Sequence, residues 1–94
     1  MQYELLITPS AQRSVKKLPL NIKQKLLEEI QILISFPMSG EPLRKEFKGL
    51  FSLHLKIVNT QYRVVYKIDN AACVILILYA ATRENFYKEL KRLL

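Results

Sequence analysis

The sequence predicts an α+β fold: a small antiparallel β-sheet with an N-terminal helical hairpin packed on it and a short C-terminal helix, in the order β-α-α-β-β-β-α. Apolar residues recur every three or four positions as far as residue 36, which is the helical period, and from residue 50 onward the period changes to two. The chain has 94 residues, of which 50% are hydrophobic. This length suits a single domain, residues 1–94, with one core.

The first half supplies one strand and two helices. The segment "YELLIT" is a strand candidate that Pro9 stops. The segment "PSAQRSVKKL" begins with Pro-Ser, a favourable helix start, and the longer segment "PLNIKQKLLEEIQILISF" follows after a residue or two, with Asn21 as a candidate cap. The expected core stripes of this helical hairpin are Ala11, Val15 and Leu18, then Ile22, Leu26, Ile30, Leu33 and Ile34.

A surface loop and two alternating strands come next. The loop "PMSGEPLRKEFKG" contains both glycines of the chain and offers basic contacts through Arg44, Lys45 and Lys48. The following strand alternates apolar residues with Ser52, His54 and Lys56, and "VNTQ" turns the chain. If Ile57 pairs with Tyr62, the opposed pairs are Lys56 with Arg63, His54 with Val65, and Ser52 with Lys67. Tyr62, Val64 and Tyr66 then share the core face.

The C-terminal third predicts an interior strand and a helix. The segment "CVILILYAA" is apolar on both faces, which is typical of a central strand, and it places Cys73 in the core. The segment "TRENFYKELKRLL" is a helix with Thr82 as a candidate N-cap.

Charge and composition narrow the class of protein. The 15 Lys and Arg residues exceed the 8 Asp and Glu residues by 7, and this net charge of +7 favours a polyanionic partner: nucleic acid, an acidic protein or an anionic membrane surface. A single cysteine and a single histidine provide no metal cluster, and no cofactor-binding motif is present. We find no signal peptide and no apolar run of the ~20 residues that a membrane span needs, so we expect a soluble cytoplasmic protein with no membrane partner.

The predicted pairing places cations on one face of the hairpin. Lys56 opposite Arg63 would repel, and a bound phosphate would relieve that repulsion. Arg83 and Tyr87 are four residues apart in the last helix, where they would share a face. Together with His54, these residue types suit RNA cleavage without a metal, although an ordinary solvated sheet face explains the hairpin pattern equally simply.

Four segments in order resemble the RelE/ParE superfamily, the toxins of type II toxin–antitoxin pairs. "YELLITPSAQRSVKKLP" is similar to the family's first strand and helix, and "LRKEFKGLFSLHL" to its approach to the sheet. "YRVVYKI" resembles its most recognisable strand, and "TRENFYKEL" its closing helix. In this family RelE-like members cleave mRNA in the ribosomal decoding site, whereas ParE-like members poison DNA gyrase.

The resemblance implies which residues act. Arg63, Arg83 and Tyr87 match family positions, Ser52 and His54 stand where many members have Lys or Arg, and Thr82 replaces a frequent histidine. We therefore expect a ribosome-dependent mRNA endoribonuclease without cofactor or metal, neutralised by an acidic antitoxin. The alternatives are a gyrase inhibitor and a degenerate toxin that only binds its antitoxin. The expected catalytic residues are His54, Lys56, Arg63, Arg83 and Tyr87, and the expected RNA contacts are Arg44, Lys45, Lys48, Ser52 and Lys67.

Overall fold

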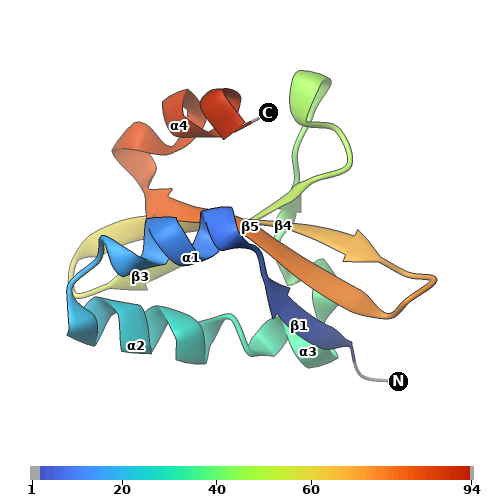
Figure 1. The fold of residues 1–94 in the computed structure, drawn as a ribbon, viewed down its shortest axis with the longest axis horizontal. Helices are drawn as coiled ribbons and strands as arrows, with labels where there is room; N and C mark the ends of the chain where they lie inside the picture. The colour runs from blue at the N-terminus through green and yellow to red at the C-terminus, as the bar shows by residue number, and fades with distance from the viewer. Residues whose placement is uncertain (1–2, 94) are drawn as a thin grey trace.

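A computed structural model describes residues 3–93, without the side chains of Asn85, Tyr87, Leu90 and Leu93. In chain order it contains β1 (Glu4–Ile7), α1 (Pro9–Lys16), α2 (Leu20–Glu29), α3 (Ile32–Ser35), β2 (Glu41–Pro42), β3 (Phe51–Ile57), β4 (Thr60–Asp69), β5 (Val74–Thr82) and α4 (Phe86–Leu93). Three short 3₁₀ turns cover Pro37–Ser39, Lys45–Phe47 and Arg83–Asn85. The predicted α+β fold class is confirmed (Figure 1).

The strands form one sheet in the order β1-β5-β4-β3-β2. Four of these strands pair antiparallel in succession, and β1 adds to β5 in parallel, with Glu4 opposite Val74 and Ile7 opposite Ile77. β5 therefore has neighbours on both sides, as its apolar sequence predicts. The sequence analysis missed the parallel direction of β1 and the two-residue strand β2.

The helical hairpin packs on one face of the sheet. Ala11, Val15, Ile22 and Leu26 are buried, which confirms the predicted stripes. The Thr8 hydroxyl caps α1 by accepting a hydrogen bond from the Ala11 N–H at 3.2 Å. Two details differ from the prediction. The second helix is divided into α2 and α3, and its N-cap position is Pro19, so the prediction that Asn21 caps it is wrong.

The two faces of the sheet carry separate apolar clusters. The larger cluster lies between the sheet and the helices α1 and α2. It includes Tyr62, Val64 and Tyr66, the three residues predicted to share the core face. A smaller cluster on the opposite face joins Val65 to Phe47 and Phe86. In Figure 1, α4 and the loop at residues 43–50 lie above the sheet and α2 lies below it. We call the face of the sheet that α4 and this loop cover the upper face.

At the ends of β5, the prediction for Cys73 is wrong and the prediction for Thr82 is confirmed in position only. Cys73 lies in the turn between β4 and β5, with a φ angle of 54° and a partly exposed side chain, and it is not a core residue. Thr82 occupies the N-cap position of the 3₁₀ turn Arg83–Asn85 without a side-chain hydrogen bond, and α4 begins three residues later than that turn does. None of the described helices is long and apolar enough to cross a membrane.

Candidate active site

The turn between β3 and β4 sets the partners on the upper face. Val58 and Asn59 form a two-residue turn and both have positive φ angles, 48° and 66°, as type I′ hairpin turns require. Ile57 therefore pairs with Thr60 rather than with Tyr62. This moves every predicted pair along by two residues. A shift by an even number leaves each side chain on its predicted face, so the faces are right and the opposed pairs are wrong.

The corrected register places His54 directly opposite Arg63. Lys56 lies opposite Gln61, and Ser52 lies opposite Val65. The predicted repulsion between Lys56 and Arg63 is therefore not a feature of this strand pair. The histidine is the residue nearest in register to the arginine, and 42% of its side chain is exposed. The side chains of His54 and Arg63 therefore start from opposed positions on the same face of the hairpin.

The Arg63 side chain is held against the start of α4. Its guanidinium carbon lies 5.3 Å from the centre of the Phe86 ring, a cation–π distance, and Phe86 is fully buried. Arg63 is itself half-buried. A guanidinium supported by a fixed aromatic ring loses less freedom when it binds an anion than one on a free side chain. This preorganisation suits a contact to phosphate.

Lys56 and Arg83 lie toward the turn end of the same sheet. Gln61, the strand partner of Lys56, lines a hollow of about 390 Å³ together with Thr82 and Arg83. Lys56 and Arg83 are both exposed. The hairpin and the residues that follow β5 therefore bring three cations, Lys56, Arg63 and Arg83, to one end of the upper face.

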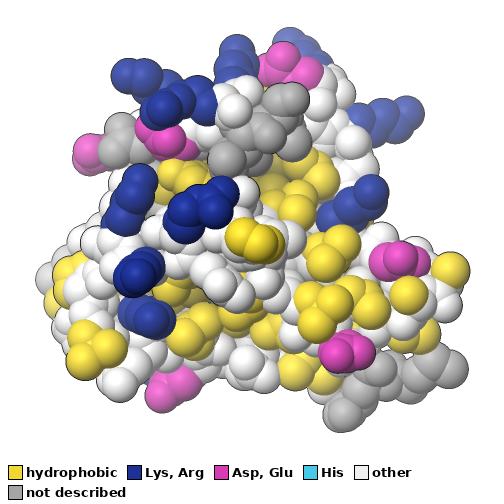
Figure 2. Space-filling model, viewed as in Figure 1, with side chains coloured by type: hydrophobic (Ala, Val, Ile, Leu, Met, Phe, Trp, Pro, Cys, Tyr) yellow, Lys and Arg dark blue, Asp and Glu magenta, His cyan; other side chains and the backbone are white. Residues whose placement is uncertain are grey.

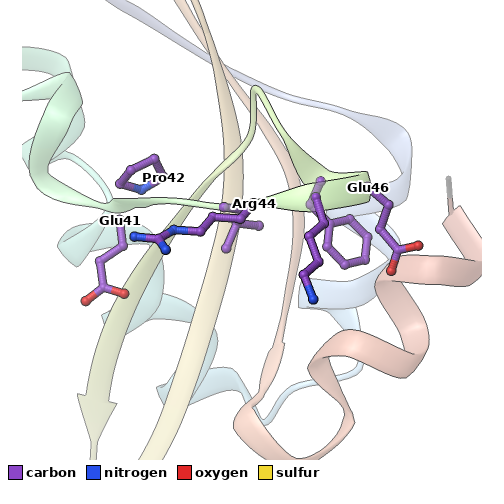
Figure 3. Close-up of a pocket in the computed structure, with 7 residues that line it drawn as sticks. Glu41, Pro42, Arg44 and Glu46 are labelled. Carbon is purple, nitrogen blue, oxygen red and sulfur yellow. The ribbon is translucent and has the colours of Figure 1, made fainter.

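The loop after β2 brings further cations to the rim of this face. Its buried Phe47 packs with Val65 and Phe86 and so fixes the loop to the sheet. Arg44 and Lys45 line a hollow of about 360 Å³ (Figure 3), and Lys48 is exposed beside them. An ion pair of 3.5 Å between Lys91 Nζ and Glu46 Oε1 joins the loop to α4.

The structure does not bring the remaining predicted site residues together with Arg63. Ser52 is fully buried, and its hydroxyl has no hydrogen-bond partner among the described residues. Lys67 is exposed on the same strand as Arg63, but four residues along a strand separate them by roughly 13 Å. Tyr87 belongs to α4, and its side chain lies outside the described residues, so its predicted contact with Arg83 stays a prediction.

The sequence analysis missed Glu41. Its Oε2 atom lies 3.7 Å from Nε2 of His54, and 78% of its side chain is exposed. Glu41 reaches the histidine because β2 pairs with β3 at Glu41–Ser52, one step diagonally from His54. A strand of two residues carries no periodic signal, so the sequence offered no means of finding this neighbour.

Two tyrosines near the site remain protonated at neutral pH. Burial raises the pKa of the Tyr66 hydroxyl above its ordinary value of 10.0, and the hydrogen bond from the Gly40 N–H opposes that shift. Burial also raises the pKa of Tyr79, with a smaller contribution from the Glu89 carboxylate. Neither group can serve as a base near pH 7.

Basic side chains are widespread beyond the site itself. Figure 2 shows them over α4 and over the α1–α2 hairpin, with fewer acidic side chains between them. The resulting positive field would attract a polyanion toward the molecule from several directions.

Comparison with known proteins relates this arrangement to a family. A family model described as the ParE-like toxin of type II bacterial toxin-antitoxin systems matches residues 5–91. Toxin RelG of Mycobacterium tuberculosis is 32% identical over 90 residues, which cover 94% of this chain and 99% of that protein. Toxin RelE of the same organism is 32% identical over 88 residues, which cover 92% of this chain and 87% of that protein.

Solved structures agree with the fold. A chain of the RelBE2 toxin–antitoxin complex from Mycobacterium tuberculosis superposes with a TM-score of 0.79 at 33% identity, covering 88% of this chain and 100% of that one. A mutant of Escherichia coli toxin RelE in the free state gives a TM-score of 0.72 at 18% identity, with both chains covered completely. The second likeness concerns the fold alone.

Proposed function

This chain belongs to the RelE/ParE superfamily and is a RelE-like toxin of a type II toxin–antitoxin system, and on that premise we propose that it is an endoribonuclease that cuts messenger RNA on the ribosome. The observation that carries the proposal is the pairing of His54 with Arg63 on the exposed side of the β3–β4 hairpin, with the Arg63 guanidinium held 5.3 Å from the Phe86 ring. This pairing supplies a proton acceptor beside a preorganised phosphate ligand.

The proposed reaction is an attack of the RNA 2′-oxygen on the adjacent phosphorus. His54 accepts the proton of the 2′-hydroxyl, the new O2′–P bond forms, and the P–O5′ bond breaks. Arg63, with Lys56 and Arg83 nearby, stabilises the negative charge that develops on the phosphoryl oxygens. A proton delivered to the 5′-oxygen completes the step, with Tyr87 as a candidate donor. The products are a 2′,3′-cyclic phosphate and a free 5′-hydroxyl.

Positioning on the ribosome would use the wider basic surface. Arg44, Lys45 and Lys48 extend the cations of the upper face along the loop after β2. Contacts between such side chains and phosphates carry no sequence information but fix the orientation of the bound RNA. The rim cations therefore serve binding, whereas His54 and Arg63 serve the chemical step.

An acidic antitoxin is the proposed protein partner. The solved relatives include toxin–antitoxin complexes, among them RelBE2 and an archaeal RelE–RelB complex. The net charge of +7 favours an acidic partner. Exposed apolar side chains such as Leu20, Phe36 and Met38 offer surface that a partner folding on this chain could bury.

Inhibition of DNA gyrase is the second candidate, because the matching family model carries the ParE-like description. The two activities differ in what they require. A gyrase inhibitor needs a binding surface only, and it has no use for a proton acceptor beside Arg63. Substitution of Arg63 therefore distinguishes the nuclease from the gyrase inhibitor.

The test compares wild-type protein with Arg63→Ala on ribosomes programmed with a defined message, and in parallel on purified gyrase. We expect wild-type protein to cut the message and leave 2′,3′-cyclic phosphate ends. Loss of a charge-assisted contact of ~1.5–3 kcal/mol should slow Arg63→Ala by roughly tenfold or more. Lys17→Ala, which removes an exposed lysine at the end of α1 on the other side of the sheet, is the matched control and should cut normally. Intact messages together with inhibited supercoiling would reject the nuclease in favour of the gyrase inhibitor.

A further inference from the structure

We propose that Glu41 is a positioning residue for His54: its carboxylate holds the Nε2–H of the imidazole so that Nδ1 is the atom that accepts the 2′-hydroxyl proton. This inference deepens the proposed nuclease function and rests on it. The distance between Glu41 Oε2 and His54 Nε2 is 3.7 Å. This distance is longer than a formed hydrogen bond, and polar contacts at catalytic sites often tighten only when substrate binds.

The backbone that carries Glu41 is firmly anchored, although β2 has only two residues. The Gly40 N–H donates a hydrogen bond of 2.9 Å to the Tyr66 hydroxyl, which in turn donates one of 2.7 Å to the Pro37 carbonyl oxygen. On the other side of β2, the Leu43 N–H donates to the Leu50 carbonyl oxygen at 2.8 Å. Tyr66 is fully buried. The hydroxyl of the buried Tyr66 therefore fixes the position of the backbone immediately before Glu41.

Gly40 permits this anchoring because no side chain could fit there. A Cβ atom at Gly40 would lie 2.6 Å from the Tyr66 hydroxyl oxygen and 2.9 Å from the Ser52 carbonyl oxygen. The close approach draws the chain against β3 immediately before Glu41. The carboxylate then lies on the same face of the sheet as His54, at the diagonal position of the β2–β3 pair.

The charges on either side of His54 complement each other. Arg63 is its partner on β4, and Glu41 approaches from β2. When the imidazole accepts a proton, it becomes a cation beside the Arg63 guanidinium, and that proximity is unfavourable. The Glu41 carboxylate offsets this repulsion while it also fixes the ring orientation and the tautomer, as carboxylates do in other acid–base sites. Figure 3 shows Glu41 at the edge of the hollow lined by the loop after β2, with the Arg44 side chain extending toward it.

The first measurement is single-turnover cleavage on programmed ribosomes by wild-type protein, Glu41→Gln and Glu41→Asp, each also in a His54→Ala background. We expect Glu41→Gln to lower the rate at saturating protein by roughly 10–100-fold, while half-saturation occurs at an equal or lower concentration because a negative charge has been removed from an RNA-binding surface. Glu41→Asp keeps the charge and should fall between the two. In the His54→Ala background, Glu41→Gln should change the rate less than about twofold, because a positioning residue acts only through its partner.

Glu46→Gln is the matched control. It removes one carboxylate from the loop that follows β2, where Glu46 pairs with Lys91 instead of with the histidine, and it should cleave at the wild-type rate. An unchanged rate for Glu41→Gln would overturn the inference. An equal loss in the presence and absence of His54 would also overturn it, because Glu41 would then act on folding or on RNA directly.

A second measurement does not depend on cleavage. His54 is the single histidine of the chain, so the nitrogen-15 signals of its imidazole can be assigned without ambiguity. We expect wild-type protein to show the proton on Nε2 more completely than Glu41→Gln does. Identical spectra would contradict the inference. If wild-type protein does not cleave RNA at all, the proposed function fails, and these spectra alone decide whether Glu41 positions His54.

Discussion

Replacing Gly40 by alanine should destabilise the protein through steric contact alone. The backbone at Gly40 has a φ angle of −85° and a ψ angle of 172°, an extended conformation that any residue adopts. The new methyl group would lie 2.6 Å and 2.8 Å from atoms of Tyr66 and 2.9 Å from the Ser52 carbonyl oxygen. The Ser52 oxygen belongs to the sheet backbone and cannot move without disturbing β3.

The expected magnitude follows from these contacts. Overpacking of this kind costs ~1–3 kcal/mol, and each of the two hydrogen bonds of the Tyr66 hydroxyl contributes ~0.5–1.5 kcal/mol if displacement breaks it. Alanine also has less conformational freedom than glycine in the unfolded chain, and this difference offsets ~0.4–1 kcal/mol of the loss of stability. The free energy of unfolding should therefore fall by about 2–4 kcal/mol, which for a domain of this size lowers Tm by roughly 10–25 °C.

Urea unfolding followed by circular dichroism measures this change, with two further variants. Gly49→Ala is the control for backbone strain, because Gly49 has a φ angle of 95° and no atom within 4 Å of an added Cβ; it should cost ~1–2 kcal/mol. Tyr66→Phe removes the hydroxyl, so Gly40→Ala should cost less in that background. A Gly40→Ala protein with the wild-type urea midpoint, or with the same cost in both backgrounds, would refute the contact.

Two further predictions concern stability. Burial raises the pKa of Tyr66 and of Tyr79 above 10.0, so the unfolded chain releases these protons at a lower pH than the folded chain does. The free energy of unfolding should therefore be constant up to about pH 10 and decline above it. Tyr79→Phe should reduce that decline in urea titrations between about pH 8 and pH 11. An equal decline in Tyr79→Phe would show that Tyr79 does not contribute. Phe86 is fully buried, so Phe86→Ala should lower the free energy of unfolding by ~3–5 kcal/mol; a loss below about 1 kcal/mol in urea unfolding would mean that α4 does not depend on this ring.

The sequence predicted which side chains share a face of the sheet better than it predicted which residues pair between strands. Alternation placed Leu53 and Ile57 toward the core, because burial of one side of a strand leaves a period of two. The register depended on the turn, and valine is a β-branched residue that rarely adopts a positive φ angle. Val58 nevertheless takes the first position of the two-residue turn with a φ angle of 48°. The sequence analysis assigned the four residues "VNTQ" to the turn, which is two residues longer than the observed turn, and it therefore misassigned the partner of Arg63.

The candidate site was predictable where a motif or a charge pattern marked it. His54, Lys56 and Arg63 lie on the upper face, as the alternation indicated. Glu41 and Phe86 were missed because their roles depend on contacts between elements that are distant in the sequence. Glu41 depends on a two-residue strand, and Phe86 on the packing of α4 against Val65 and Phe47. Such contacts arise from tertiary structure and leave no periodic trace in the sequence.

The parallel pairing of β1 with β5 has a consequence for the synthesis of the protein. Glu4 finds its strand partner at Val74, so β1 cannot enter the sheet until β5 has been synthesised. At translation rates of ~5–20 residues per second, the interval between the two strands is roughly 4–14 s. Pairings so distant in sequence also slow folding itself, because the long loop must close before its contacts form. The sheet that carries His54 and Arg63 is therefore completed only after β5 has been synthesised.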